Sequence, residues 1–195
     1  MKKLGFVFAM LIIALAATSA MAQNVGDNSV YFVTYYANNV SGAPDATVRF
    51  INDGSQGTNA SGDLWAAFYV FDDSQELTEC CACVVTPDGI LSEDVKTELT
   101  ATPLTGKIPG RGVIKVISSS SWDPTAPWPV TGLRGTATHI QRATPTSGSY
   151  ATTETAFADA NLGSAEMALL PQLCYFADTL LSGVGCSCTP EDHDF

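Results

Sequence analysis

The sequence predicts a mainly β, β-sandwich-like domain with one C-terminal helix, stapled by disulfides. Three observations support this prediction. Short apolar or β-branched segments recur along the chain between Gly, Pro, Asn and Asp turns, as they do in sandwiches. One late segment has the apolar spacing of a helix. Six cysteines fall into two groups, one near the middle of the chain and one near its end.

The first expected strand, residues 30–36, reads VYFVTYY and is apolar on both alternating faces. A strand of this kind needs cover on both sides. Pairing within its own sheet is the favoured expectation. The alternative is delivery to the sheet of a neighbouring subunit, which would satisfy an unpaired edge there and build a filament. The residues expected to mediate such strand exchange are Val30, Tyr31, Phe32, Val33, Tyr35 and Tyr36.

The segment 64–71, LWAAFYVF, is the most apolar of the other strand candidates and is expected to be central in its sheet. The following SQELTE is expected to form a short helical turn that leads into the cysteines. Residues 95–104 show period-two patterning and are expected to form a strand. The remaining expected strands are 47–52, 112–118, 133–141 and 149–157.

Residues 164–182, SAEMALLPQLCYFADTLLS, form the one expected helix. Ser164 is suited to cap its N-terminus, and Gly183 is suited to end it. Pro171 either kinks the helix or marks a later start. The apolar stripe expected to face the sheet consists of Leu169, Leu170, Leu173, Phe176, Leu180 and Leu181.

The two cysteine groups are expected to be joined by at least one disulfide, because the compartment is expected to be oxidising. The first group is Cys80, Cys81 and Cys83, and the second is Cys174, Cys186 and Cys188. The sequence leaves the pairing open, although adjacent cysteines are poor partners for each other. A bridge that closes a loop of roughly 100 residues contributes about 4 to 5 kcal/mol in the chain-entropy model. The alternative is a thiolate metal site, but the two-residue spacer of zinc knuckles is absent.

The N-terminus has the layout of a secretory signal peptide: a lysine pair precedes an apolar run that ends in small residues at Ala22. We expect a signal peptide at 1–22, an N-terminal arm or first strand at 23–37 and a single β-rich domain at 38–195. No apolar segment reaches the roughly 20 residues of a membrane span. The expected location is therefore secreted, extracellular or at the cell surface.

The chain is acidic, with 9 Lys and Arg against 20 Asp and Glu. Removal of Lys2 and Lys3 with the signal peptide leaves a net charge of 7 − 20 = −13. Nucleic acid is excluded as a partner, because binding phosphates requires clustered Lys and Arg. The partner that remains predicted is another copy of the chain, in a homo-polymer.

Few residues are suited to catalysis. His139 and His193 are the two histidines, and no nucleophile, zinc or nucleotide motif is present. His139 is expected to be structural, although a triad assembled around it in space would make a hydrolase. No cofactor is expected; Ca²⁺ is the alternative, at acidic groups that are more often solvated. These groups are Asp72, Asp73, Glu76 and Glu79 beside the cysteines, and Glu191, Asp192 and Asp194 in the tail.

Trp122 and Trp128 lie on a loop, 118–132, that is too rich in Pro for a central strand. Exposed tryptophans stack on sugars or anchor protein partners, whereas buried ones would cover the end of the sandwich. The sequence leaves both alternatives open.

The block YVFDDSQELTECCACVVTPDGIL, followed by GVIKVIS and a late CSC, resembles secreted cysteine-rich proteins of uncertain function from soil and environmental bacteria. The Cys-Cys-x-Cys-x-x-Thr-Pro-Asp-Gly core carries the resemblance, which covers most of the mature chain. In that group a Cys often stands where this chain has Trp65, so the resemblance does not define the pairing here. It implies no catalytic residue.

Together these features predict a secreted extracellular structural or interaction protein, a filament or matrix subunit that assembles by N-terminal strand exchange. Two alternatives are a carbohydrate- or calcium-dependent binding module and a secreted hydrolase.

Overall fold

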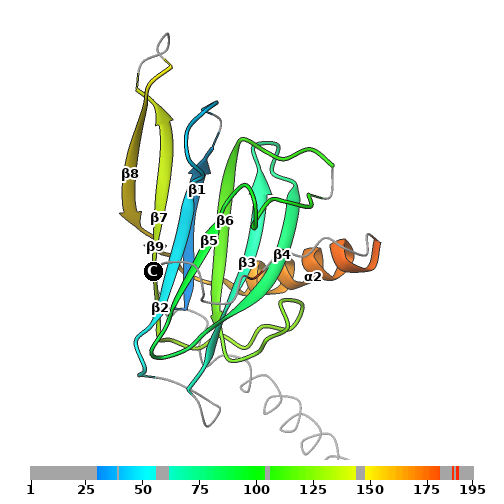
Figure 1. The fold of residues 1–195 in the computed structure, drawn as a ribbon. Helices are drawn as coiled ribbons and strands as arrows, with labels where there is room; N and C mark the ends of the chain where they lie inside the picture. Colours follow the sequence, from blue (N-terminus) through cyan, green and yellow to red (C-terminus); the bar gives the residue numbers. More distant parts are fainter. Residues whose placement is uncertain are drawn as a thin grey trace, which may run out of the picture.

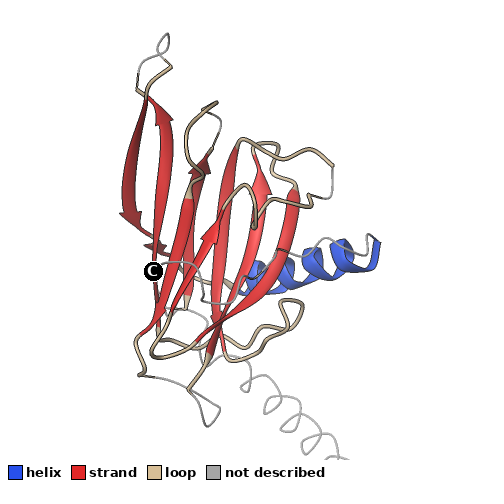
Figure 2. Ribbon diagram, in the orientation of Figure 1, coloured by secondary structure: helices blue, strands red, loops and turns tan. Residues whose placement is uncertain are grey.

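The fold is a β-sandwich of two antiparallel sheets with one helix packed on an outer face (Figures 1 and 2). The computed structural model describes residues 30–38, 40–55, 62–103, 106–143, 148–180, 186 and 188. Sheet A has the strand order β4-β3-β6-β1-β9, and sheet B has the order β5-β2-β7-β8. The elements are β1 (Tyr31–Ala37), β2 (Thr47–Asn52), β3 (Leu64–Asp72), β4 (Leu77–Val85), β5 (Ile90–Asp94), β6 (Arg111–Ser119), β7 (Leu133–Arg142), β8 (Tyr150–Ala156), β9 (Ala158–Asp159) and α2 (Ser164–Leu180). The predicted fold class is confirmed.

The core between the sheets is centred on Phe50 of β2. Its ring packs edge-on against Phe32 of β1 and Phe68 of β3, and lies 4.9 Å from the ring of Phe157. Gly135 of β7 leaves the space for this ring, because a Cβ there would lie 2.5 Å from a Phe50 ring carbon. Each fully buried Phe contributes about 1.5 to 3 kcal/mol. The aromatic cluster therefore joins strands of both sheets.

Strand β1 lies within its own sheet, between β6 and β9. It pairs with β6 along its whole length, from Tyr31 opposite Ile117 to Ala37 opposite Arg111. On its other side it pairs with β9 only at Phe32 and Val33. The expectation that both faces need cover is confirmed, because the strand contributes to the core between the sheets and to the cluster under α2.

Helix α2 covers the outer face of sheet A, and in Figure 1 its C-terminal end extends beyond β4. Glu166 in its first turn accepts a hydrogen bond of 3.0 Å from the Tyr31 hydroxyl and forms an ion pair with Lys115. The helix begins at Ser164, as predicted, and continues through Pro171.

The predicted apolar stripe of α2 is wrong in part. Leu170 is fully buried, but its neighbour Leu169 is 46% exposed and Phe176 is also exposed. The buried side chains that pack on the sheet are Leu170, Cys174 and Ala177, and the predicted Leu173 is partly buried beside them together with Met167. The Leu180 side chain and Leu181 lie outside the described part of the chain. The reason is covalent, because the Cys80–Cys174 disulfide fixes which side of the helix faces β4.

Two further segments differ from the prediction. SQELTE forms no helical turn, since β4 begins at Leu77 and the first cysteine group lies in this strand. Residues 95–104 form turns rather than a strand, although 104 lies outside the described residues. The Asp94 carbonyl accepts hydrogen bonds from the Glu98 and Leu99 N–H groups, so the backbone winds as in a helix. Val95 and Leu99 are both buried, and their spacing fits one helical turn.

Candidate functional site

Three disulfides join strand β4 to helix α2 and to the C-terminal residues Cys186 and Cys188. The pairs are Cys80–Cys174, Cys81–Cys186 and Cys83–Cys188, with Cα–Cα distances of 5.8, 5.3 and 5.3 Å. The expected bridging between the two cysteine groups is confirmed. Successive side chains of a strand point to opposite faces. Cys80 therefore binds the helix on the outer face, while Cys81 and Cys83 join the core between the sheets.

The three disulfides also decide whether the cysteines can form the thiolate metal site considered as the alternative. The sulfurs of Cys81, Cys83 and Cys188 lie within 4.8 Å of one another. Each of them belongs to a disulfide, and none of the six cysteines is free. Because the thiolate is the metal ligand, this cluster has no ligand to offer while it is oxidised.

Trp122 and Trp128 project from a loop that is held by its own hydrogen bonds. The Ser119 hydroxyl oxygen accepts hydrogen bonds from the N–H groups of Ser121 and Trp128. The Asp123 carboxylate accepts two more from Thr125. The Trp122 and Trp128 side chains are 72% and 71% exposed. The alternative that these rings cover the end of the sandwich is therefore wrong.

The loop also has a fixed position on the sandwich. The Tyr69 hydroxyl, on the outer face of sheet A, donates a 2.6 Å hydrogen bond to the Pro124 carbonyl. Val130 and Ser118 are joined by a backbone hydrogen bond of 2.9 Å, which closes the loop. The two indoles are consequently presented on a preformed support.

His139 is buried and lies against β1. Its ring stacks on the Tyr35 ring at 4.1 Å, and its Nε2 is 2.8 Å from the Thr155 hydroxyl. Burial lowers the pKa of this imidazole. Among the described residues, no carboxylate accepts a hydrogen bond from its Nδ1. A triad requires a carboxylate at that atom, so these contacts do not orient His139 as a catalytic base.

The acidic residues predicted to form one patch beside the cysteines differ in burial. Glu79 is fully buried, and burial raises its pKa to about 7. Its Oε1 accepts a 2.6 Å hydrogen bond from the Thr102 N–H, whereas Oε2 has no partner among the residues that the structure describes. Asp73 on the surface pairs with Arg111 at 2.8 Å. Glu79 therefore does not share a calcium site with the surface carboxylates.

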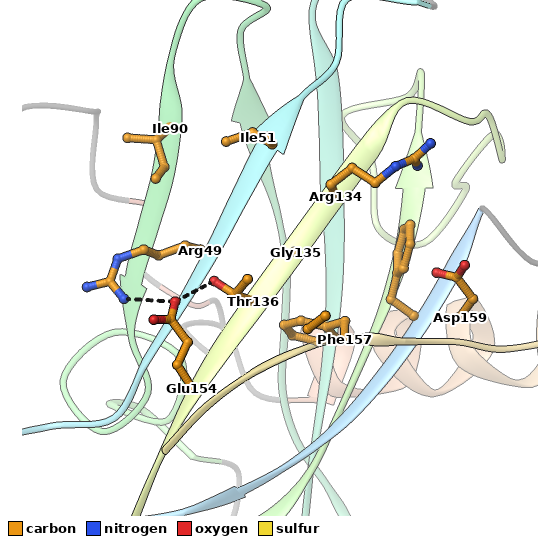
Figure 3. Close-up of a pocket in the computed structure, with 11 residues that line it drawn as sticks. Arg49, Ile51, Ile90, Arg134, Gly135, Thr136, Glu154, Phe157 and Asp159 are labelled. Atoms are coloured by element: carbon orange, nitrogen blue, oxygen red, sulfur yellow. Dashed lines mark hydrogen bonds and ion pairs between the residues drawn. The ribbon is translucent and has the colours of Figure 1, made fainter. Parts of the chain in front are cut away.

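A groove of about 590 Å³ lies over sheet B (Figure 3). Its guanidinium groups already have partners: Arg49 lies 4.0 Å from Glu154, and Arg134 lies 3.4 Å from Asp53. Ile51 and Ile90 contribute exposed apolar surface. The lining thus offers no spare cation for an anionic ligand.

Strand β8 forms an exposed edge of sheet B beside the groove. It pairs with β7 from Tyr150 to Ala156, and every one of its seven residues is exposed. In Figure 1 the β7–β8 hairpin stands at one side of the sandwich and rises beyond the other strands. The sequence interpretation included this strand without recognising its edge. The available signal was composition, since YATTETA has no apolar face to bury.

No protein-family model, curated protein or solved structure matches the chain. Within the described ranges, no helix combines the length and apolar character needed to cross a membrane. The expected signal peptide at 1–22, His193 and the tail acids Glu191, Asp192 and Asp194 lie outside these ranges.

Proposed function

We propose that this chain is a secreted extracellular structural subunit that assembles with copies of itself by exchange of strand β1. The observation that carries the proposal is the placement of β1. Val30, Tyr31, Phe32 and Tyr36 are all buried, yet the strand's partners β6 and β9 are distant in sequence. A copy of β1 from a neighbouring chain would make the same contacts.

The connection between β1 and the rest of the sandwich permits this exchange. Residues 38–46 link β1 in sheet A to β2 in sheet B, and nine extended residues span about 30 Å. The side chains of Asn38 and Asp45 are hydrogen bonded to each other across this loop. Asp45 also accepts hydrogen bonds from the Lys96 and Thr97 N–H groups, so its carboxylate remains satisfied when Asn38 moves away.

Three disulfides support an extracellular location, because such bonds persist in oxidising compartments. They also keep the acceptor intact during exchange. None of the bridges involves β1, so β4 stays joined to α2 and to Cys186 and Cys188 when β1 leaves.

A cross-link between β1 and β6 distinguishes exchange from pairing within one chain. Ser118 N–H donates to the Val30 carbonyl, so the odd-numbered residues of β1 form the non-hydrogen-bonded pairs with β6. Tyr35 and Val113 form such a pair. In a Tyr35→Cys/Val113→Cys variant, assembled and oxidised, we expect a covalent ladder on a non-reducing gel.

The control is Ala66→Cys/Ser118→Cys, which links β3 to β6 within one chain and should give only monomers. Tyr35→Cys/Val113→Cys protein that is assembled and oxidised but runs as a monomer would contradict strand exchange.

A second candidate function is binding of a neutral polysaccharide, favoured by the exposure of Trp122 and Trp128 on their rigid loop. Indole faces stack on sugar rings. The loop from Ser119 to Val130 contains no Lys or Arg, and the chain is strongly acidic, which favours an uncharged ligand over an anionic one.

We expect Trp122→Ala/Trp128→Ala to abolish retention of the protein on insoluble neutral polysaccharides and to leave its thermal unfolding unchanged. The matched control is Ile108→Ala, which removes an exposed apolar side chain elsewhere. Equal retention of the double variant and the parent would remove this candidate.

A further inference from the structure

We propose that β8 pairs edge to edge with β8 of a second copy, antiparallel and in a register centred on Thr153. This inference does not rest on exchange of β1, because it concerns the other sheet and different residues. A strand edge exposes backbone donors and acceptors that template pairing with another chain. In the described chain β8 pairs only with β7.

The other edge strands have features that oppose pairing with another chain, and β8 lacks these features. β9 has two residues, β5 and β4 carry the buried acidic residues Glu93 and Glu79, and β4 also shifts register against β3. β8 has seven residues, no Lys, no Pro and a continuous register with β7. Natural sheets usually blunt such edges. An unguarded edge therefore indicates a contact surface.

The one charge in β8 is drawn toward its own sheet. Glu154 accepts a 2.9 Å hydrogen bond from the Thr136 hydroxyl and lies 4.0 Å from Arg49. Figure 3 shows its carboxylate directed toward these two residues. Because Arg49 partly neutralises it, Glu154 repels a second strand less than a free carboxylate would.

The hydrogen bonds with β7 define which backbone groups face outward. Ala143 N–H donates to the Ser149 carbonyl, and Phe157 N–H donates to the Gly135 carbonyl. The odd-numbered residues of β8 therefore bond to β7. The N–H and C=O groups of Tyr150, Thr152, Glu154 and Ala156 point to the free edge.

Only the register centred on Thr153 pairs all of these outward groups. It sets Tyr150 opposite Ala156 and Thr152 opposite Glu154, so a large side chain meets a small one and the carboxylates do not face each other. A shift by two residues in one direction would place Glu154 opposite Glu154, which is destabilising. A shift in the other direction leaves Ala156 unpaired.

The occupant is a second copy because the edge is self-complementary in this register. A two-fold contact uses the same surface on both subunits, and Thr153 lies on the axis opposite itself. Thr–Thr pairs across strands are favourable. The strongly acidic net charge opposes association, so added salt should strengthen this dimer.

A cysteine scan of the purified protein tests both the contact and its register. Opposed residues of a non-hydrogen-bonded pair have Cα atoms about 4.5 Å apart, within disulfide range. Thr153→Cys should therefore form covalent dimers on oxidation. Ala151→Cys, on the same face, would be separated from its counterpart by about 13 Å and should remain monomeric. A mixture of Ala151→Cys and Thr155→Cys chains should form dimers.

Two outcomes overturn the proposal. One is a Thr153→Cys protein that stays monomeric at high concentration and high salt. The other is cross-linking of Ala151→Cys as efficient as that of Thr153→Cys, which would indicate random collision. Both readouts use β8 alone, so they separate failure of this contact from failure of β1 exchange.

A charge pair at Thr152 provides an independent measurement. Thr152→Glu places a carboxylate opposite Glu154 twice by symmetry, and the dimer dissociation constant from sedimentation equilibrium should rise about tenfold. Thr152→Lys places an ammonium there and should lower the constant. Equal weakening by both variants would contradict the register, because a purely steric effect would not depend on the sign of the charge.

Discussion

At the scale of single residues, Glu79 is the most informative group. It is buried on β4, and its pKa is raised from 4.5 to about 7 by desolvation. Between these pH values the folded state holds a proton that the unfolded state has released. The free energy of unfolding therefore falls as pH rises from about 4.5 to 7 and stays low above that window.

We expect Glu79→Gln to remove this dependence, because Gln keeps an acceptor for the Thr102 N–H without a charge. The variant should exceed the parent in stability by on the order of 2 kcal/mol at pH 8 and match it near pH 4. Urea unfolding at the two pH values measures the difference. Glu76→Gln, at an exposed position, is the control. A parent-like pH slope in Glu79→Gln would contradict the assignment.

The pKa of His139 is lowered, so its effect on stability has the opposite pH dependence from that of Glu79. Burial lowers its pKa below 6.5, so the unfolded state takes up a proton first as pH falls. The free energy of unfolding therefore declines as pH drops below about 6.5. Both pKa shifts arise chiefly from burial of the side chain.

At the scale of elements, α2 shows how one covalent bond decides which face of a helix is buried. Leu169 and Leu170 are adjacent and chemically identical, yet the first is 46% exposed and the second is fully buried. The helix rotation set by Cys174 separates them.

This pair forms a matched test. Leu170→Ala should lower the free energy of unfolding by about 2 to 4 kcal/mol through cavity formation. Leu169→Ala should change it by less than about 0.5 kcal/mol. Urea denaturation of both variants with intact disulfides provides the comparison, and equal losses would show that α2 packs with a different face.

At the scale of the whole molecule, three features followed from the sequence. Two-sided apolar character marked β1, an even cysteine count marked the bridging between the two groups, and a capped apolar pattern marked the start of α2 at Ser164. Each of these features depends on local composition or on the number of cysteines, and neither requires knowing which residues come into contact in the fold.

Other features depended on partners distant in sequence. Leu77–Val85 reads LTECCACVV, where polar residues and cysteines obscure a strand that is buried by its contacts. Residues 95 and 99 fit both alternation and a helical turn, and the Asp94 carbonyl decides between them. The exposure of Trp122 and the free edge of β8 are likewise set by tertiary arrangement.

The three bridges on β4 also constrain how the polypeptide matures. The native partners of Cys80, Cys81 and Cys83 are separated from them by 94, 105 and 105 positions. The thiols of Cys80, Cys81 and Cys83 are therefore synthesised before their native partners and remain unpaired until Cys174, Cys186 and Cys188 follow. Cys81 and Cys83 sulfurs lie only 3.8 Å apart. Premature oxidation between such neighbours is the expected error, and its repair by thiol–disulfide exchange would set the pace of maturation.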